Sequence, residues 1–167
     1  MGKKIVNKNG FSFVEVLVTL AILFLSLSTI SVFMAKSIKA SREAQNQIIA
    51  TGLAEEGVEF VRNFKDRNVA FVSGVKSNGS YIVDKDTTYA GFTTNAGSGK
   101  LYLNNGGFFV HAAVGNKNTK FYRKLVILND VSKVTVNSYV SWNPTGSFAN
   151  CTIANKCLLV SSVMIDQ

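Results

Sequence analysis

The first third of the chain is dominated by one long uncharged stretch. From position 16 to position 35 no residue carries a charge, and most are Leu, Ile, Val, Phe or Ala. Twenty residues in an α-helix, at about 1.5 Å each, reach the roughly 30 Å of a bilayer's hydrocarbon core. We therefore expect residues 11–35 to form the membrane-spanning or filament-core half of a helix.

A helical pattern continues beyond this stretch. Between positions 36 and 65 there is no proline, and apolar or small residues recur every three to four positions. Arg62 and Asp66 are spaced for an i,i+4 contact. We expect one helix over residues 12–66, apolar on all sides in its first half and amphipathic in its second. The apolar stripe of the second half consists of Ile49, Leu53, Gly57, Phe60 or Val61, and Phe64.

The C-terminal part of the chain changes to short β-prone runs separated by Gly, Asn and Ser. Strands that follow each other through short turns pair antiparallel, so we expect an α+β fold with one helix packed on an antiparallel sheet. The expected strands are 81–83, 101–103, 108–113, 121–128, 133–142 and 158–165, with turns at 104–107, 115–118 and 129–130. In the clearest strand, 133–142, one face holds Val134, Val136, Val140 and Trp142, and the other holds Lys133, Thr135, Asn137, Tyr139 and Ser141.

Length and charge limit the organisation of the chain. Its 167 residues correspond to one domain, and about 130 of them remain outside the apolar stretch, which is enough for a small core. The formal net charge is +8, and removing Lys3, Lys4 and Lys8 would leave +5. Lysines ahead of an apolar span favour a cytoplasmic N-terminus. Residues 36–167 are therefore expected to form an extracytoplasmic globular domain.

One carboxylate, Glu15, stands at the edge of the apolar stretch. A carboxylate in a membrane helix costs roughly 2.5–3.5 kcal/mol on insertion scales, so it is a candidate functional residue that needs a cationic partner. A cut between Gly10 and Phe11 would supply one, because the new α-amino group would lie one helical turn from Glu15. The carboxylate would also complement the helix macrodipole.

The run Gly10-Phe11-Ser12-Phe13-Val14-Glu15, followed by the apolar stretch, resembles the N-terminal processing motif of type IV prepilins and type II secretion pseudopilins. The resemblance covers about positions 8–35. It implies a leader peptide of residues 1–10, cleavage after Gly10 by a membrane-embedded prepilin peptidase, and N-methylation of Phe11. It also implies filament assembly through the N-terminal helix, with Glu15 paired to a terminal amine, and a pilin fold with a variable connection over about 67–100.

The implied function is that of a non-enzymatic filament subunit. Its implied partners are other pilin or pseudopilin subunits, prepilin peptidase and an inner-membrane assembly platform. Its implied location is the cytoplasmic (inner) membrane and then an extracytoplasmic filament at the cell surface. Val32 stands where many major pilins have a helix-bending proline, and residues 53–62 and 140–142 loosely resemble minor pilins. A minor pilin or pseudopilin is therefore favoured.

Several alternatives compete with this interpretation. A conventional secretory signal would be cut near Ser26-Leu27-Ser28, and a plain single-span anchor would leave Glu15 unexplained. A membrane-tethered adhesion or ligand-binding domain would never polymerise. A DNA-uptake pseudopilus subunit fits the basic charge, but the sequence lacks an evident cluster of aromatic and basic residues, which disfavours nucleic acid as a partner.

Candidate catalytic and metal-binding residues are sparse, so no catalytic residue, metal or cofactor is expected. His111 is the only histidine and no Cys-x-x-Cys pair is present, so the usual zinc ligands cannot be assembled. Asp84 and Asp86 are too few for a calcium site, and residues 97–100 lack the pattern of a phosphate loop. His111 is expected to be structural. The cations expected to be solvated at strand edges are Arg123, Lys124 and Lys133.

Cys151 and Cys157 are separated by five residues, before the last expected strand. Export would place them in an oxidising compartment, where a disulfide is expected, and many pilins carry one in this region. Two unpaired buried thiols are the alternative, because geometry can prevent closure of so short a loop.

Overall fold

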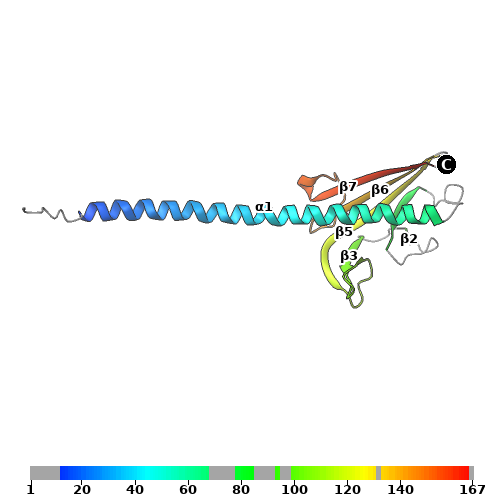
Figure 1. Ribbon diagram of the computed structural model, residues 1–167, viewed down its shortest axis with the longest axis horizontal. Helices are drawn as coiled ribbons and strands as arrows, with labels where there is room; N and C mark the ends of the chain where they lie inside the picture. Colours follow the sequence, from blue (N-terminus) through cyan, green and yellow to red (C-terminus); the bar gives the residue numbers. More distant parts are fainter. Residues whose placement is uncertain (1–11, 68–77, 85–92, 95–98, 131–132, 166–167) are drawn as a thin grey trace, which may run out of the picture. The chain divides into compact units, whose positions relative to one another are not determined.

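The computed structural model describes residues 12–67, 78–84, 93–94, 99–130 and 133–165. These residues form one α-helix, seven strands and one short 3-10 helix (Figure 1). The elements are α1 (Phe13–Arg67), β1 (Gly79–Ile82), β2 (Thr93–Thr94), β3 (Lys100–Leu103), β4 (Phe109–Val110), β5 (Lys117–Asp130), β6 (Lys133–Ser141), η2 (Ile153–Asn155) and β7 (Cys157–Ile165). One long helix with an antiparallel sheet is the α+β arrangement that the sequence predicts.

The chain divides into two compact units, Met1–Glu43 and Ala44–Gln167. The first unit contains the apolar part of α1. The second unit, called the globular domain below, contains the remainder of α1 and the whole sheet. The helix bounds differ from the expected 12–66 by one residue at each end.

β5 is the centre of the sheet. β6 pairs with it through nine residue pairs, and β7 pairs with β6 through another nine. On the other edge of β5, its first half pairs with β3 and its second half with β1. The two-residue strands β4 and β2 pair with β3 and β1. Every pairing is antiparallel, as expected for strands connected mainly through short loops.

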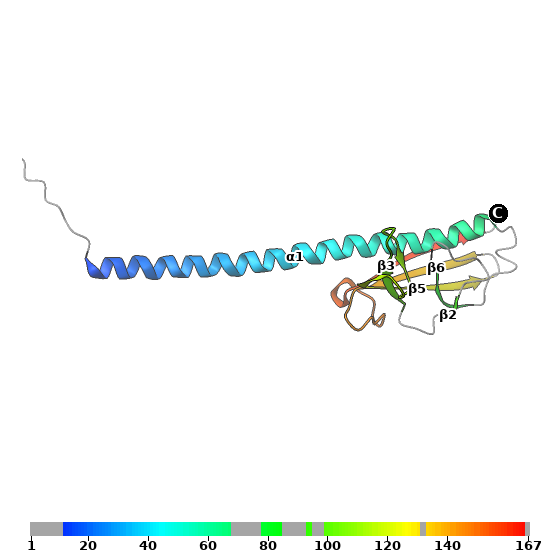
Figure 2. The ribbon, with the colours of Figure 1, turned by 90° about the horizontal axis from the view of Figure 1, so that it is seen from below.

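The C-terminal part of α1 lies across one face of the sheet (Figure 2). Its buried residues are Ala50, Leu53, Ala54, Gly57, Val58 and Val61. The predicted apolar stripe is correct at Leu53, Gly57 and Val61, which are buried. Ile49 was placed wrongly, because it is 40% exposed while Ala50 is fully buried. Small residues occupy the contact line because the helix backbone approaches the sheet closely.

Gly57 marks this close approach. A Cβ added there would lie 2.8 Å from Oγ of Ser138 and 2.9 Å from Cδ2 of Leu125. A glycine inside a helix costs roughly 0.5–1 kcal/mol relative to alanine. The packing of α1 against β5 and β6 explains why this position has no side chain.

Several expected boundaries were wrong. β5 begins at Lys117, inside the expected turn at 115–118, and β2 was not expected. Of residues 108–113, only Phe109 and Val110 form a strand, because the preceding turn is closed by Asn104 and the following His111 bonds to Asp84. In the turn, Oδ1 of Asn104 accepts hydrogen bonds from the backbone N–H groups of Gly106 and Phe108. Residues 129–130, expected to form a turn, belong to β5, because the ladder with β6 continues to the last residue of that strand.

Ser141 lies on the face of β6 opposite the buried valines, as the alternation predicts, yet it is fully buried. The loop between β6 and β7 folds back over this end of the sheet: Phe148 packs edge-to-face on Tyr139, and Gly146 packs on the ring of Tyr122. A loop that returns over a sheet face buries polar positions which alternation assigns to solvent.

Candidate functional site

Glu15 lies in the first turn of α1, and its side chain is exposed. Its backbone N–H donates to the carbonyl of Ser12 at 3.0 Å. Ser12 and Glu15 have the spacing of a capping box, in which a serine and a glutamate three residues later bond each other's backbone amides. The carboxylate also complements the positive end of the helix macrodipole. Glu15 therefore has a local role available to it, which the Ser-x-x-Glu spacing alone could have indicated.

Gly10 and Phe11, the expected cleavage site and methylated residue, lie outside the described residues, as does the whole of the expected leader peptide. Cleavage, N-methylation and the pairing of Glu15 with a terminal amine stay predictions.

The apolar part of α1 has the properties of a membrane span. Its most apolar 18-residue window has a mean hydropathy of 2.5, and none of that window is buried within the protein. Large side chains are widely exposed, for example Phe24 at 66% and Phe33 at 73%. By length and composition this helix can cross a membrane.

The hydroxyl groups of this stretch are satisfied within the helix. Each donates to a backbone carbonyl three or four residues earlier, at 2.8–2.9 Å, and the donors are Thr19, Ser26, Ser28, Thr29 and Ser31. An unsatisfied polar group in hydrocarbon costs several kcal/mol, so these bonds make the segment compatible with lipid. The same bonds make it compatible with a dry bundle of helices.

Arg123 forms the centre of a buried polar cluster, so its expected place at a solvated strand edge was wrong. The residue is 1% exposed, and its side chain lies between β5 and α1. Nη1 donates to Oε2 of Glu56 at 3.0 Å and to the carbonyl of Leu53 at 3.3 Å. Nη2 donates to the carbonyl of Val83 at 2.8 Å, and the guanidinium carbon lies 5.3 Å from the ring centre of Phe60.

The strand alternation contained a signal for this burial. Phe121, Arg123, Leu125 and Ile127 follow each other at period two in β5, and all four are buried. An arginine inside an apolar alternation occupies the core face of its strand, where it needs acceptors from other elements.

Asp84 and His111 complete the cluster. Oδ1 of Asp84 lies 2.6 Å from Nδ1 of His111 and 3.7 Å from Nη2 of Arg123. Oδ2 accepts the backbone N–H of His111 at 3.0 Å. His111 thus ties its segment to the residues that follow β1. With its carboxylate engaged in this way, Asp84 is not a free calcium ligand, and Asp86 lies outside the described residues.

The cluster shifts the pKa values of Asp84 and Arg123. Burial raises the pKa of Asp84, but the hydrogen bonds and charge of His111, with the charge of Arg123, outweigh burial and hold that pKa below its ordinary 3.8. Burial lowers the pKa of Arg123, and the carboxylates of Glu56 and Asp84 oppose that effect. A guanidinium stays protonated in such a setting, so the cluster is an ionic network that joins α1, β5 and the end of β1.

Other expected surface contacts differ in detail. Arg62 forms its ion pair with Glu59, one turn before it, rather than the anticipated contact with Asp66. Lys133 is exposed and pairs with Asp130 at 3.8 Å. Among the residues that the structure describes, no group of three or more His, Cys, Asp or Glu side chains could hold a metal ion.

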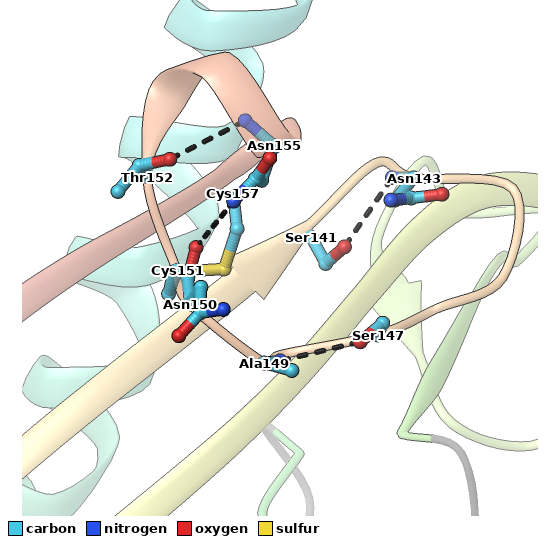
Figure 3. Close-up of a disulfide and its surroundings, with 9 residues drawn as sticks. All are labelled: Ser141, Asn143, Ser147, Ala149, Asn150, Cys151, Thr152, Asn155 and Cys157. Carbon is cyan, nitrogen blue, oxygen red and sulfur yellow. Dashed lines mark hydrogen bonds between the residues drawn. A yellow bond between two sulfur atoms is a disulfide. The ribbon is translucent and has the colours of Figure 1, made fainter.

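Cys151 and Cys157 form a disulfide, with their Cα atoms 4.8 Å apart (Figure 3). The loop between them turns through η2: Oγ1 of Thr152 accepts the N–H of Asn155 at 3.4 Å, and Lys156 takes a left-handed conformation with φ of 56°. The N–H of Cys157 then donates to the carbonyl of Thr152 at 3.0 Å. These local bonds allow a loop of five residues to close, so the expectation of a disulfide is confirmed.

The site that emerges is the exposed apolar helix with Glu15 in its first turn, carried by a disulfide-bonded α+β domain. Comparison with protein-family models, with curated proteins and with solved structures found no match. The resemblance to pilins therefore rests on the N-terminal motif and on this arrangement of helix and sheet.

Proposed function

We propose that this protein is a structural subunit of a type IV pilus-like or type II secretion filament, either a minor pilin or a pseudopilin. The observation that carries the proposal is a membrane-length apolar helix, exposed along its length, whose first turn holds a single carboxylate. In this proposal prepilin peptidase removes residues 1–10, and the new amine of Phe11 becomes the partner of Glu15.

The apolar helix suits a subunit that moves from lipid into a filament. Its backbone and hydroxyl groups are bonded internally, so neither environment leaves them unsatisfied. Lipid contacts and helix contacts are similarly apolar, and apolar surface alone therefore selects weakly between bilayer and bundle. A buried pair between Glu15 and the amine of a neighbouring chain would favour the bundle over the bilayer.

The test compares Glu15→Ala and Glu15→Gln with the wild type, each expressed with prepilin peptidase and an assembly machine. Glutamine can still serve in a capping box but carries no charge, whereas alanine does neither. If the charge pairs with the amine, both variants leave that amine buried and unpaired at a cost of roughly 3–5 kcal/mol per subunit. Both should reach the membrane in normal amounts and be strongly depleted from sheared filaments.

Each other outcome counts against a stated part of the proposal. Normal incorporation of Glu15→Gln alone would assign Glu15 to capping the helix. Equal incorporation of both variants would remove any assembly role for this residue. Absence of the wild type from filaments would favour the membrane-tethered domain.

Processing is checked in the same material by mass spectrometry. The mature chain should begin at Phe11 with a methylated amine, and Gly10→Leu should block the cut while leaving membrane insertion intact. A bulky side chain at Gly10 obstructs the close approach of a protease to the backbone. A mature start near Thr29 would establish an ordinary signal peptide instead.

A further inference from the structure

Charge is distributed unevenly over the globular domain. Its described residues from Gly99 to Ile165 include one carboxylate and seven lysine or arginine residues. Arg123 is buried against Glu56, and Lys133 pairs with the one carboxylate, Asp130. Three of the remaining lysines are called the lysine patch: Lys100, Lys120 and Lys124. Lys100 and Lys124 lie on the outer face of the sheet, opposite α1. Lys120 is exposed two positions before Tyr122 in β5, and its Nζ lies 5.7 Å from the ring centre of Phe121.

The strand register brings the lysine patch together with aromatic residues. Lys100 of β3 lies opposite Tyr122 of β5, and Lys124 of β5 lies opposite Tyr139 of β6. In the described part of the chain, none of the three lysines forms an ion pair with a carboxylate. The cluster of aromatic and basic residues that the linear sequence does not reveal is therefore assembled by the sheet.

Two of these lysines are held by pairs of rings. Nζ of Lys100 lies 5.9 Å and 5.7 Å from the ring centres of Tyr102 and Tyr122. Nζ of Lys124 lies 5.6 Å and 4.9 Å from those of Tyr139 and Phe148. Cation–π contacts of this kind restrict a lysine side chain, so less conformational entropy is lost when its ammonium binds an anion.

The same contacts indicate how a ligand would bind. The four rings are half-buried and already have an ammonium over one face, which limits the stacking on which single-stranded nucleic acids depend. Binding then rests on charge, through the release of counterions. That effect is large for a duplex, which carries one charge per about 1.7 Å of its axis.

We infer that the lysine patch binds double-stranded DNA through its phosphates, without sequence preference. The inference does not depend on filament assembly, because every residue concerned lies in the globular domain. Binding of this electrostatic kind has a Kd of roughly 10⁻⁴–10⁻⁶ M at physiological salt and weakens steeply as salt rises.

The test titrates a labelled duplex of arbitrary sequence with the full chain in neutral detergent, and follows fluorescence anisotropy across a salt series. Each lysine–phosphate contact adds about 0.9 to the slope of log affinity against log salt. The variant with Lys100→Gln, Lys120→Gln and Lys124→Gln should reduce that slope by about 2.7, and should weaken binding roughly five- to tenfold per lysine at about 100 mM salt.

Two matched variants separate charge from fold. Lys133→Gln removes a lysine from the same sheet face, but one paired with Asp130, and it should change the slope little. Replacing the three patch lysines by arginine keeps the charge and should restore binding.

Three results would overturn the inference. The first is a triple glutamine variant that keeps the wild-type slope, and the second is a loss of affinity in Lys133→Gln as large as that of a patch substitution. The third is displacement of the duplex by polygalacturonate, a polysaccharide of lower charge density, at equal charge concentration, which would assign the surface to an anionic glycan.

Discussion

A guanidinium with almost no exposed surface loses its hydration, so it is stable only when acceptors replace the water. Arg123 has three such acceptors from two segments: the carbonyl of Leu53 and the carboxylate of Glu56 in α1, and the carbonyl of Val83 after β1. Asp84 contributes a second carboxylate, which His111 orients. The cluster makes the position of α1 on the sheet depend on a few polar contacts within an otherwise apolar interface.

The lowered pKa of Asp84 predicts an acid-sensitive domain. The pKa of Asp84 is lower in the folded than in the unfolded chain, so the unfolded chain binds more protons near pH 3.8. The stabilisation from ionised Asp84 is therefore fully present well above pH 3.8 and is lost as pH falls through the folded pKa. The free energy of unfolding of the wild type, measured with urea in detergent, should decline over this window.

Asp84→Asn tests the assignment. It should lower the free energy of unfolding by about 1–3 kcal/mol near pH 7, since buried donors lose a charged acceptor. The difference from the wild type should shrink below pH 3.8. Asp130→Asn, at an exposed carboxylate, should change stability by less than about 0.5 kcal/mol. If the difference in free energy of unfolding between wild type and Asp84→Asn stays constant with pH, the charge of the carboxylate does not contribute to stability.

At the scale of elements, α1 serves two environments along one continuous helix. Its N-terminal part exposes apolar side chains around its circumference, whereas its C-terminal part buries a stripe of small and aliphatic residues against the sheet. Gly52 and Gly57 both lie in this C-terminal part, but their surroundings differ. Nothing lies within 4 Å of a Cβ added at Gly52, while one added at Gly57 meets Ser138 and Leu125 below 3.0 Å.

These two glycines form a matched pair for substitution. Gly52→Ala should stabilise the protein by roughly 0.5–1 kcal/mol, because alanine is the better helix former and meets no neighbour. Gly57→Ala should destabilise it by about 1–3 kcal/mol, because the added methyl group forces α1 away from β5 and β6. Urea unfolding of both variants measures the difference. Equal effects at the two positions would show that the helix–sheet contact relaxes freely.

At the scale of the whole molecule, the sheet is closed at one end by the loop between β6 and β7. That loop covers part of the outer face through Phe148 and Gly146, and the Cys151–Cys157 bond restricts its C-terminal section. Cys157 is the first residue of β7, so the disulfide ties the loop to the strand at the edge of the sheet.

Removing the disulfide tests its contribution. The variant with Cys151→Ser and Cys157→Ser should lose about 2–4 kcal/mol in its free energy of unfolding while keeping its strand pairing. Peptide mapping of the native protein without reductant should recover the two cysteines in one linked peptide pair. Free thiols in that protein, or a variant as stable as the wild type, would contradict the role given to this bond.

The sequence by itself determined the features that depend on neighbouring residues. The uncharged stretch, the length of α1, the alternation of β6 and the close spacing of Cys151 and Cys157 are local patterns, and each corresponds to an element in the structure. Periodicity is set by backbone geometry, so a single chain segment is enough to recognise it. The α+β class followed from the order of these elements.

Only the tertiary structure decided which residues meet. The burial of Arg123 depends on acceptors up to seventy positions away, and that of Ser141 depends on a loop that returns over the sheet. The lysine patch likewise combines strands whose register no local pattern specifies. The free energy of a buried charge or an exposed lysine is determined by partners distant in sequence, and a pattern read along the chain does not contain them.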